Sequence, residues 1–323
     1  MAHPLGPTRD QIRTVDPVLS GMVNARMNAD ADFIGDRAFP PLYEEGRVSG
    51  QVSLLNTGMA SAGNIEIDRG SGSRYAEVGF VPSFLAFACR EYGVMVAIDD
   101  ELRSQSQVGL DLNELAAIRA GHEVQIQREL RLVNAFFGTG DWTNEATLGA
   151  AAQWDDAGGT PLANIWTGKR AVKINSGVEA NAAIIGWDGF RVAVQNGDIT
   201  ALVPADSRQS QITLTALQAR LAEAFELASL FVGRAVRNTA NLLAAETFAF
   251  IWVDNLLIFR HEPAGSVNAA AAAQFASTAG GAPTVTDRWF DDDIRRQKVR
   301  VRETRDELVI DALKGHLTLD LAN

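Results

Sequence analysis

The chain has 323 residues, of which 46% are hydrophobic and 21% are charged, so its composition is that of an ordinary globular protein with an ample core. The formal net charge of −11 argues against a protein that reads duplex DNA through a basic surface. The single cysteine, Cys89, excludes an intrachain disulfide framework, and no apolar stretch reaches the roughly 18 residues that a membrane helix needs.

Residues 1–45 are polar and contain prolines that are spread along the segment. This composition predicts an extended N-terminal arm with little core of its own. An arm of this length is either disordered or packed on a partner.

The next segment has the pattern of a long β-hairpin. Residues 47–54 alternate apolar and polar side chains, a period of two that predicts a half-buried strand, and residues 75–80 alternate again. The connection between them is about 19 residues long and rich in small residues, which exceeds an ordinary hairpin turn. Because this tip cannot bury itself, its charged side chains are candidate assembly contacts: Glu66, Asp68, Arg69 and Arg74.

The strongest helix is predicted over residues 111–138, and Gly138 ends it. At 1.5 Å per residue, about 26 residues make a rod of roughly 39 Å, which is long for a small domain and suggests a spine. The expected buried stripe of this helix consists of Leu115, Ile118, Val124, Leu130, Val133 and Phe137.

The stretch WDDAGGTPLANI, residues 154–165, places Asp155 and Asp156 in a glycine-rich turn. General acid–base catalysis needs two carboxylates that face one site and have separated pKa values. Adjacent residues in a turn point in different directions, so we interpret the pair as a joint in the chain rather than as a catalytic or metal site. Thr160 then serves as an N-cap, and Pro161 takes the first helical position.

The second half of the chain predicts shorter elements. A buried strand is expected at 181–186, an amphipathic helix at 215–227, and strands at 229–236, 247–253 and 253–261. Residues 265–284 are low-complexity, and we expect a surface segment with one or two helical turns there. Two strands are expected at the end of the chain, residues 298–303 and 307–321, joined by a turn at 304–306.

The motifs of common catalytic and metal sites are missing from the sequence. His122 and Glu123 are followed by Ile126 where a zinc helix needs a second histidine, and no G-x-S-x-G elbow occurs. The stretch NADADF has Phe33 where a calcium loop needs glycine. The acidic stretch FDDDIRR, residues 290–296, is interpreted as a solvated turn with ion pairs rather than a metal cluster. We therefore expect no catalytic, cofactor or metal residues and no enzyme activity.

Several of these features in this order resemble the major capsid proteins of tailed bacteriophages, which have the Hong Kong 97-type fold, and the nearest resemblance is to the lambda-like branch. The passage VGFVPSFLAFACREYGVMVAIDDEL before the long helix is similar to the step from extended loop to spine in that family. The most telling match is the order of a Trp/Asp turn, a Pro-led helix, a Gly, an Asn, and an apolar strand: Trp154, Asp155, Pro161, Gly177, Asn181 and Gly186.

The resemblance spans roughly residues 35–323 and implies an α+β fold with five parts. These are an N-terminal arm at 1–45, an extended β-hairpin (E-loop) with its flanking strands at 46–98, a peripheral domain with the spine helix at 99–180, an axial domain at 181–282, and C-terminal strands at 283–323 that return to the peripheral domain.

The implied function is self-assembly into pentamers and hexamers of an icosahedral shell, which encloses double-stranded DNA without sequence-specific binding. A portal, and in some relatives a scaffold or a decoration protein, would be partners, and no membrane is involved. The expected location is the virion, after assembly in the host cytoplasm. An encapsulin-like compartment shell is the alternative, and a soluble hydrolase lacks a nucleophile–base pair.

One departure from the namesake phage concerns its Lys–Asn crosslinks, which use a lysine on the extended loop. The four lysines of this chain are Lys169, Lys173, Lys298 and Lys314, and none lies between residues 46 and 98. We therefore do not predict that crosslinking chemistry.

Overall fold

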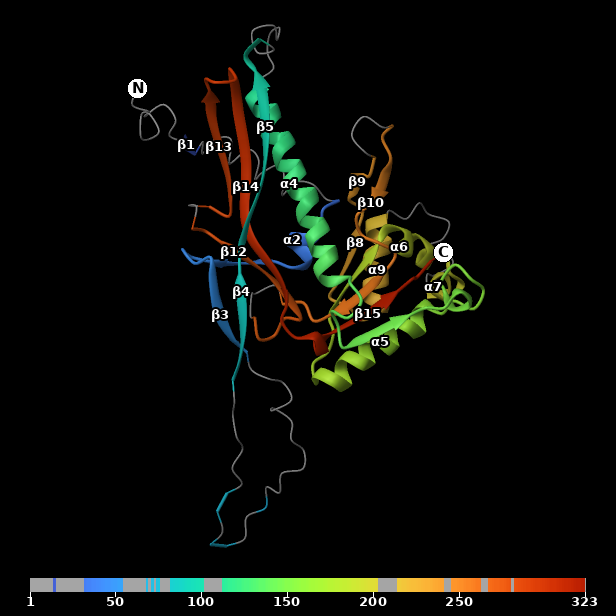
Figure 1. Cartoon of the computed structure of the whole chain (residues 1–323). Helices are drawn as coiled ribbons and strands as arrows, with labels where there is room; N and C mark the ends of the chain where they lie inside the picture. Colours follow the sequence, from blue (N-terminus) through green and yellow to red (C-terminus); the bar gives the residue numbers. More distant parts are fainter. Residues whose placement is uncertain are drawn as a thin grey trace.

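The computed structural model describes residues 14–15, 32–54, 68, 71–72, 74–75, 82–101, 112–202, 214–240, 245–262, 267–279 and 282–322. It is a mixed α+β protein with two lobes, each built on its own sheet (Figure 1). No helix within these ranges is long and apolar enough to cross a membrane.

The first lobe is organised by β14 (Arg296–Val309), a strand of 14 residues. It pairs antiparallel with β5 (Arg90–Asp99), β13 (Thr284–Asp291) and β12 (Ala272–Ser277). Two strands from the start of the chain complete the sheet: β2 (Pro41–Glu44) lies parallel to β12, and β1 (Thr14–Val15) pairs with β13. The sheet therefore joins residues from both ends of the sequence.

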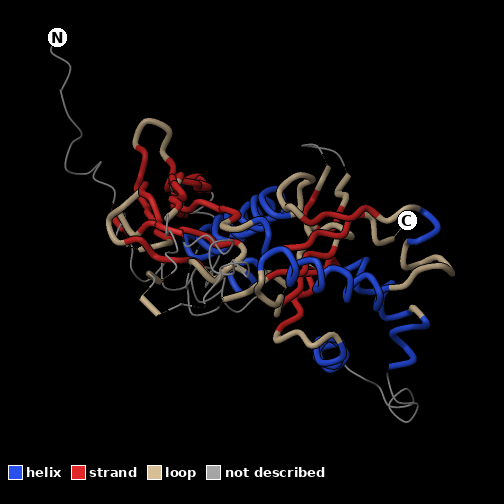
Figure 2. The backbone as a smooth tube through the Cα atoms, turned by 90° about the horizontal axis from the view of Figure 1, so that it is seen from below, coloured by secondary structure: helices blue, strands red, loops and turns tan. Residues whose placement is uncertain are grey.

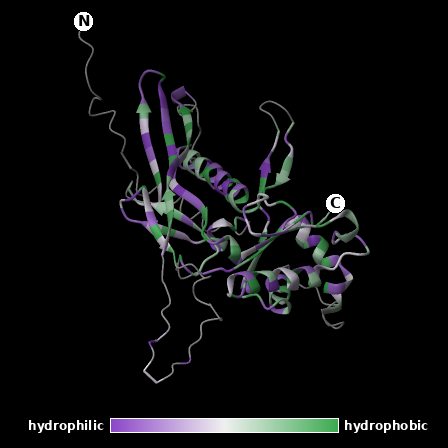
Figure 3. Cartoon of the chain, turned by 60° about the horizontal axis from the view of Figure 1, so that its bottom comes forward, coloured by the Kyte–Doolittle hydropathy of each residue, from purple (hydrophilic) through white to green (hydrophobic). Residues whose placement is uncertain are grey.

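The long helix is confirmed as α4 (Leu112–Phe136), which crosses β14 and β5. Its predicted buried stripe is confirmed only in part: Val124 and Phe137 are buried, Ile118, Leu130 and Val133 are partly buried, and Leu115 is 46% exposed. The face toward the sheet has small side chains such as Ala120, which let the helix approach closely, followed by Arg128 and Glu129, which are buried with polar partners. Figure 3 shows hydrophilic residues along this helix.

The hairpin is formed by β3 (Ser49–Leu54) and β4 (Ser83–Ala88), which pair antiparallel from Ser49↔Ala88 to Leu54↔Ser83. The predicted alternation along β3 is confirmed, since every second residue is partly covered. The expected second strand at 75–80 is described only at Tyr75, and its other residues lie outside the described ranges. The hairpin is held to the lobe by Phe87, which stacks on Phe275 with ring centroids 4.7 Å apart.

The second lobe is a five-stranded sheet in the order β6 (Asn144–Thr147), β15 (Gly315–Leu319), β11 (Leu256–Phe259), β7 (Ala182–Gly186) and β8 (Ser229–Gly233). Around it lie α5 (Pro161–Ser176), α6 (Trp187–Gln195), α7 (Gly197–Leu202) and α9 (Leu214–Ala224) (Figure 2). The strand expected at 181–186 and the helices expected after Thr160 and at 215–227 are confirmed. A separate ribbon pairs β9 (Val236–Asn238) with β10 (Phe248–Phe250).

Two predictions near the C-terminus are wrong. The low-complexity segment contains β12, whose six residues are all buried, because small alanines fit between β14 and β2. The turn expected at 304–306 is absent, and β14 runs straight through it. Polar residues are tolerated there because Arg305 has buried partners and the Asp306 carboxylate accepts a hydrogen bond from the Ala88 amide at 2.8 Å.

The N-terminal segment contributes to the core, which its polar composition did not predict. Between Asp32 and Glu44 the chain forms α2 (Gly35–Ala38) and β2, and the side chains of Ile34 and Phe39 are each 1% exposed. Sheet membership also crosses the expected domain boundaries, because β12 belongs to the first sheet, whereas β6 and β15 belong to the second.

Candidate functional site

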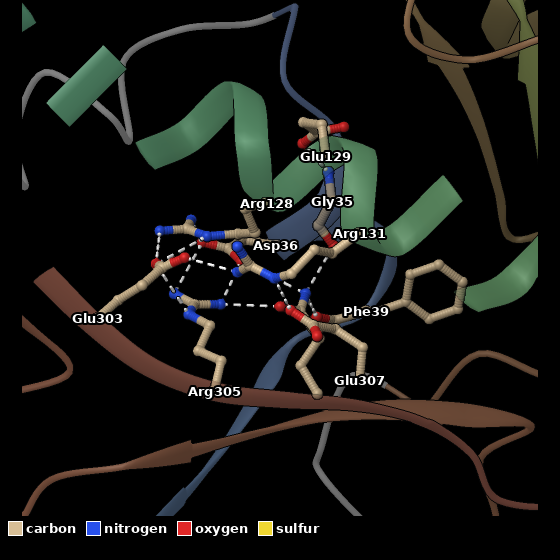
Figure 4. Close-up of polar contacts among 10 residues, drawn as sticks. Gly35, Asp36, Phe39, Arg128, Glu129, Arg131, Glu303, Arg305 and Glu307 are labelled. Atoms are coloured by element: carbon tan, nitrogen blue, oxygen red, sulfur yellow. Dashed lines mark hydrogen bonds and ion pairs between the residues drawn. The ribbon is translucent and has the colours of Figure 1, made fainter. Parts of the chain in front are cut away.

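A buried cluster of charged residues lies where α2, α4 and β14 meet (Figure 4). Arg128 of α4 donates from Nε to Glu303 Oε2 at 3.0 Å and from Nη1 to Asp36 Oδ2 at 2.6 Å. The side chain of Arg128 is 5% exposed, and that of Glu303 is fully buried. The cluster therefore ties the N-terminal segment to the long helix and to the central strand.

Two further arginines complete the charge balance. Arg131 donates to Glu303 at 2.8 Å and to Glu307 at 3.0 Å. Arg305 donates to Asp36 at 2.7 Å and to Gln274 Oε1 at 2.9 Å. Three guanidinium groups thus face three carboxylates, which is the arrangement that compensates buried charges.

The electrostatics follow from this balance. Burial alone would raise the pKa of Glu303, but the charges of Arg128 and Arg305 outweigh it and lower that pKa to about 2. Glu303 is therefore ionised in the folded protein and holds three arginines together.

Glu129 is the exception, because hydrogen-bond donors rather than cations face its carboxylate. Its Oε1 accepts from the Gly35 amide at 2.7 Å, and its Oε2 accepts from the Trp252 indole Nε1 at 2.5 Å. Burial raises its pKa to about 7, against the opposing effect of these two hydrogen bonds. Since Trp252 precedes β11, this side chain links α2 and α4 to the second lobe.

Arg128 and Glu129 look like solvent-facing residues in the middle of a helix, so the sequence did not predict this cluster. One signal was available: Val124, Arg128 and Leu132 share one face at i, i+4 and i+8, so an apolar face continues through Arg128. The cluster positions backbone elements, and each of its carboxylates already has partners.

The residues predicted as assembly contacts are only partly described. Asp68 and Arg74 are exposed, whereas Glu66 and Arg69 lie outside the described residues. Their role as contacts stays a prediction.

The turn at residues 154–160 is a structural joint on one side and solvent-facing on the other. Trp154 is 2% exposed, whereas Asp155 and Asp156 are exposed. The Asp156 amide donates to Gln153 O at 3.1 Å, and the Gly159 amide donates to Asp156 O at 3.0 Å. The predicted N-cap role is not seen, because the Thr160 side chain makes no capping hydrogen bond; Pro161 does start the helix.

Other residues singled out in the sequence have structural surroundings. Cys89 is buried, and burial raises the pKa of its thiol to about 11, so it is packed rather than nucleophilic. Residues 292–295 form the turn between β13 and β14, with an ion pair between Lys298 and Asp291 at 2.6 Å. Within the described ranges, no three His, Cys, Asp or Glu residues gather in a way that could hold a metal.

No protein-family model matches this chain, and no curated protein matches it. Among solved structures, it is similar to a phage-related protein from Bordetella bronchiseptica RB50, with a TM-score of 0.68 and 16% identity over 96% of this chain and 99% of the other.

Two further structures extend this similarity. The capsid of a native GTA particle matches with a TM-score of 0.55 and 12% identity, over 98% of this chain and 95% of the other. A virus-like particle from Pyrococcus furiosus matches with a TM-score of 0.51 and 11% identity, over 93% and 97%. The chain therefore has the α+β fold of phage capsid proteins.

Proposed function

We propose that this protein is a major capsid protein of a tailed phage, which self-assembles into the icosahedral shell around the genome. The observation that carries the proposal is the match to the phage-related protein over 96% of this chain and 99% of the other. A fold alone does not determine function, but here the similarity covers whole subunits rather than one common domain.

The exposed surface of the hairpin supports assembly. Phe84 on β4 is 64% exposed, whereas Phe87 on the same strand is buried. A two-stranded hairpin is at best marginally stable in water and needs packing partners. Contacts with neighbouring subunits would supply them.

The parts of the proposed fold follow from this assignment. α4 is the spine helix of the peripheral domain (99–180), and residues 46–98 are the E-loop with its flanking strands. The arm at 1–45, the axial domain at 181–282 and the C-terminal strands at 283–323 keep their predicted limits as proposals, although the two sheets cross them.

The proposed partners are other copies of the chain in pentamers and hexamers, a portal, and, where the phage uses them, scaffold and decoration proteins. Double-stranded DNA is enclosed without sequence-specific contacts, which suits a chain of net charge −11. The protein has no catalytic role, is assembled in the host cytoplasm and resides in the virion.

A second candidate is an encapsulin-like shell around cargo proteins. The structural similarity to the virus-like particle from Pyrococcus furiosus, at a TM-score of 0.51, supports this second candidate function. The two functions differ in what the shell contains.

Electron microscopy of the purified full-length protein tests the proposal. The expected result is closed icosahedral particles or their pentameric and hexameric units. Particles from infected or induced cells should contain DNA and a portal vertex, whereas an encapsulin-like shell would contain protein cargo. A chain that stays monomeric under all assembly conditions would contradict both functions.

Deletion of residues 62–71 tests the predicted contacts at the hairpin tip. The pairing of β3 with β4 and the stacking of Phe87 on Phe275 lie outside the deletion, so the subunit should fold with an unchanged melting temperature. Assembly should fail, and particle yield by sedimentation should fall at least about tenfold. Normal particles from the deletion variant would show that the tip is not a contact.

A further inference from the structure

The exposed face of α5 differs in charge from the protein as a whole. The chain has 40 Asp and Glu against 29 Lys and Arg, yet α5 contains no acidic residue. Residues spaced by four, seven and eight positions share one face of a helix. Here that exposed face is formed by Trp166, Arg170, Lys173 and Ile174.

This face is unusual because it combines apolar and cationic groups. Trp166 is 41% exposed and Ile174 is 62% exposed. Within the part of the chain that the structure describes, neither Arg170 nor Lys173 forms an ion pair with an acid. An apolar patch with cations of this kind is suited to a protein surface of opposite charge.

A surface with that charge lies at the other end of the same helix. The turn before α5 and the start of α7 line a hollow of about 570 Å³. Asp155, Asp156 and Asp198 are exposed in its lining, and no Lys or Arg lines it. Arg170 and Lys173 lie roughly 14 and 18 Å along the axis from the start of the helix, so they are distant from the hollow of their own subunit.

We infer that the exposed face of α5 docks against the acidic hollow of a second copy of this chain. The inference rests on the proposed function and names the two surfaces that meet between neighbouring subunits. Because the two patches differ, the contact is heterologous, and such contacts close into rings when the rotation between subunits allows it. Trp166 and Ile174 form the apolar centre of the contact, and the ion pairs set its register.

Nucleic acid is the other polyanion that could meet a basic face, but it fits less well. Arg170 and Lys173 would neutralise only two phosphates, and a chain of net charge −11 repels a polyanion. Ile174 has no partner on a phosphate backbone, whereas it can be buried against a protein.

Charge reversal in the full-length chain tests the inference. The variants are Arg170→Glu with Lys173→Glu, Asp155→Lys with Asp156→Lys, and all four changes together. Sedimentation and electron microscopy measure particle yield, and circular dichroism melting of each variant checks that the subunit folds. Each double variant should lose at least about tenfold in particles, and the fourfold variant should regain most of the yield.

A matched control reverses two arginines on the other lobe, Arg295→Glu with Arg296→Glu, whose side chains are 80% and 48% exposed. The variant that combines this control with the two Asp→Lys changes should have the same low particle yield as the Asp→Lys variant alone. Folded double variants that assemble normally, or a fourfold variant that stays unassembled, would overturn the inference. Normal shells from the Arg170 and Lys173 variant that hold less DNA would assign the face to nucleic acid instead. A wild-type chain that never self-associates would overturn the proposed function as well.

Discussion

At the scale of single residues, the buried charges between α2, α4 and β14 determine how the first lobe is held together. The cluster contains Asp36, Glu303 and Glu307 with three arginines, and it is balanced in charge. Removing one partner of such a buried set leaves an uncompensated charge in a low-dielectric environment, which is more costly than the loss of the contact itself.

Glu303→Gln should therefore lower the free energy of unfolding by about 3–5 kcal/mol at pH 7. Because the folded pKa of Glu303 is about 2, below its unfolded value of 4.5, its contribution is present above pH 4.5 and is lost as the pH falls toward 2. Urea unfolding at pH 7 and at about pH 3 measures both effects, and the variant should lose less stability on acidification than the wild type.

Glu307→Gln is the matched control. Burial raises the pKa of Glu307, so its charge is less stabilised than that of Glu303, and a neutral amide should cost only about 1 kcal/mol. Equal losses for the two variants would contradict a special role for Glu303.

Glu129 should show the opposite dependence on pH. Its folded pKa of about 7 lies above the unfolded value of 4.5, so its contribution to stability is present below pH 4.5 and is lost as the pH rises through 7. The Glu129→Gln variant has an uncharged amide at this position at every pH. Relative to the variant, the wild type should lose about 2–3 kcal/mol between pH 5 and pH 8, measured by urea unfolding. Parallel curves for the two proteins would show that the carboxyl group does not titrate in this range.

At the scale of secondary-structure elements, α4 shows what a pattern can and cannot predict. The length and end of the helix follow from its composition and Gly138, but the side that faces the sheet follows only in part, because Val124 is buried there as expected whereas Leu115 is exposed. Large aliphatic residues suggested one stripe, whereas close approach to β14 and β5 selects a face of small residues. That selection depends on the partner strands, which are distant in sequence.

Substitutions on the two sides of α4 distinguish these alternatives. Ala120 is fully buried near Val299 and Val301, so Ala120→Leu should overpack the interface and cost about 1–3 kcal/mol. Leu115→Ala should change stability by less than about 0.5 kcal/mol, since Leu115 is 46% exposed. Urea unfolding of the subunit measures both. A larger loss of stability from Leu115→Ala would indicate that Leu115 is buried, as the sequence predicted.

Other elements also divide into those that local sequence predicts and those that depend on distant partner strands. The local signals of β3, β7 and α5 were sufficient, because alternation, an apolar run or a proline start is encoded within each element. The strand β12 was missed because alanines carry no period of their own, and its burial comes from β14 and β2. The turn expected inside β14 was wrong because Arg305 and Asp306 find partners on other elements.

At the scale of the whole molecule, order along the chain does not match the division into lobes. The C-terminal segment passes from β14 in the first sheet to β15 in the second, and β6 pairs parallel with β15. A resemblance in the order of motifs was enough to predict the class of fold, but sheet membership depends on pairings between residues more than 150 positions apart. The contact role of the hairpin tip stays a prediction, and the buried cluster was missed because its charged residues look solvent-facing in the sequence.

The position of β14 after all of its partner strands in the sequence has a consequence for biosynthesis. This strand pairs with β5, β12 and β13, so the first sheet cannot close until the ribosome has made residues 296–309. Until then β5 and the polar inner face of α4 lack their partner, and pairing across such sequence separations forms slowly. Each subunit can therefore complete its first lobe only after the strand that organises it has been made.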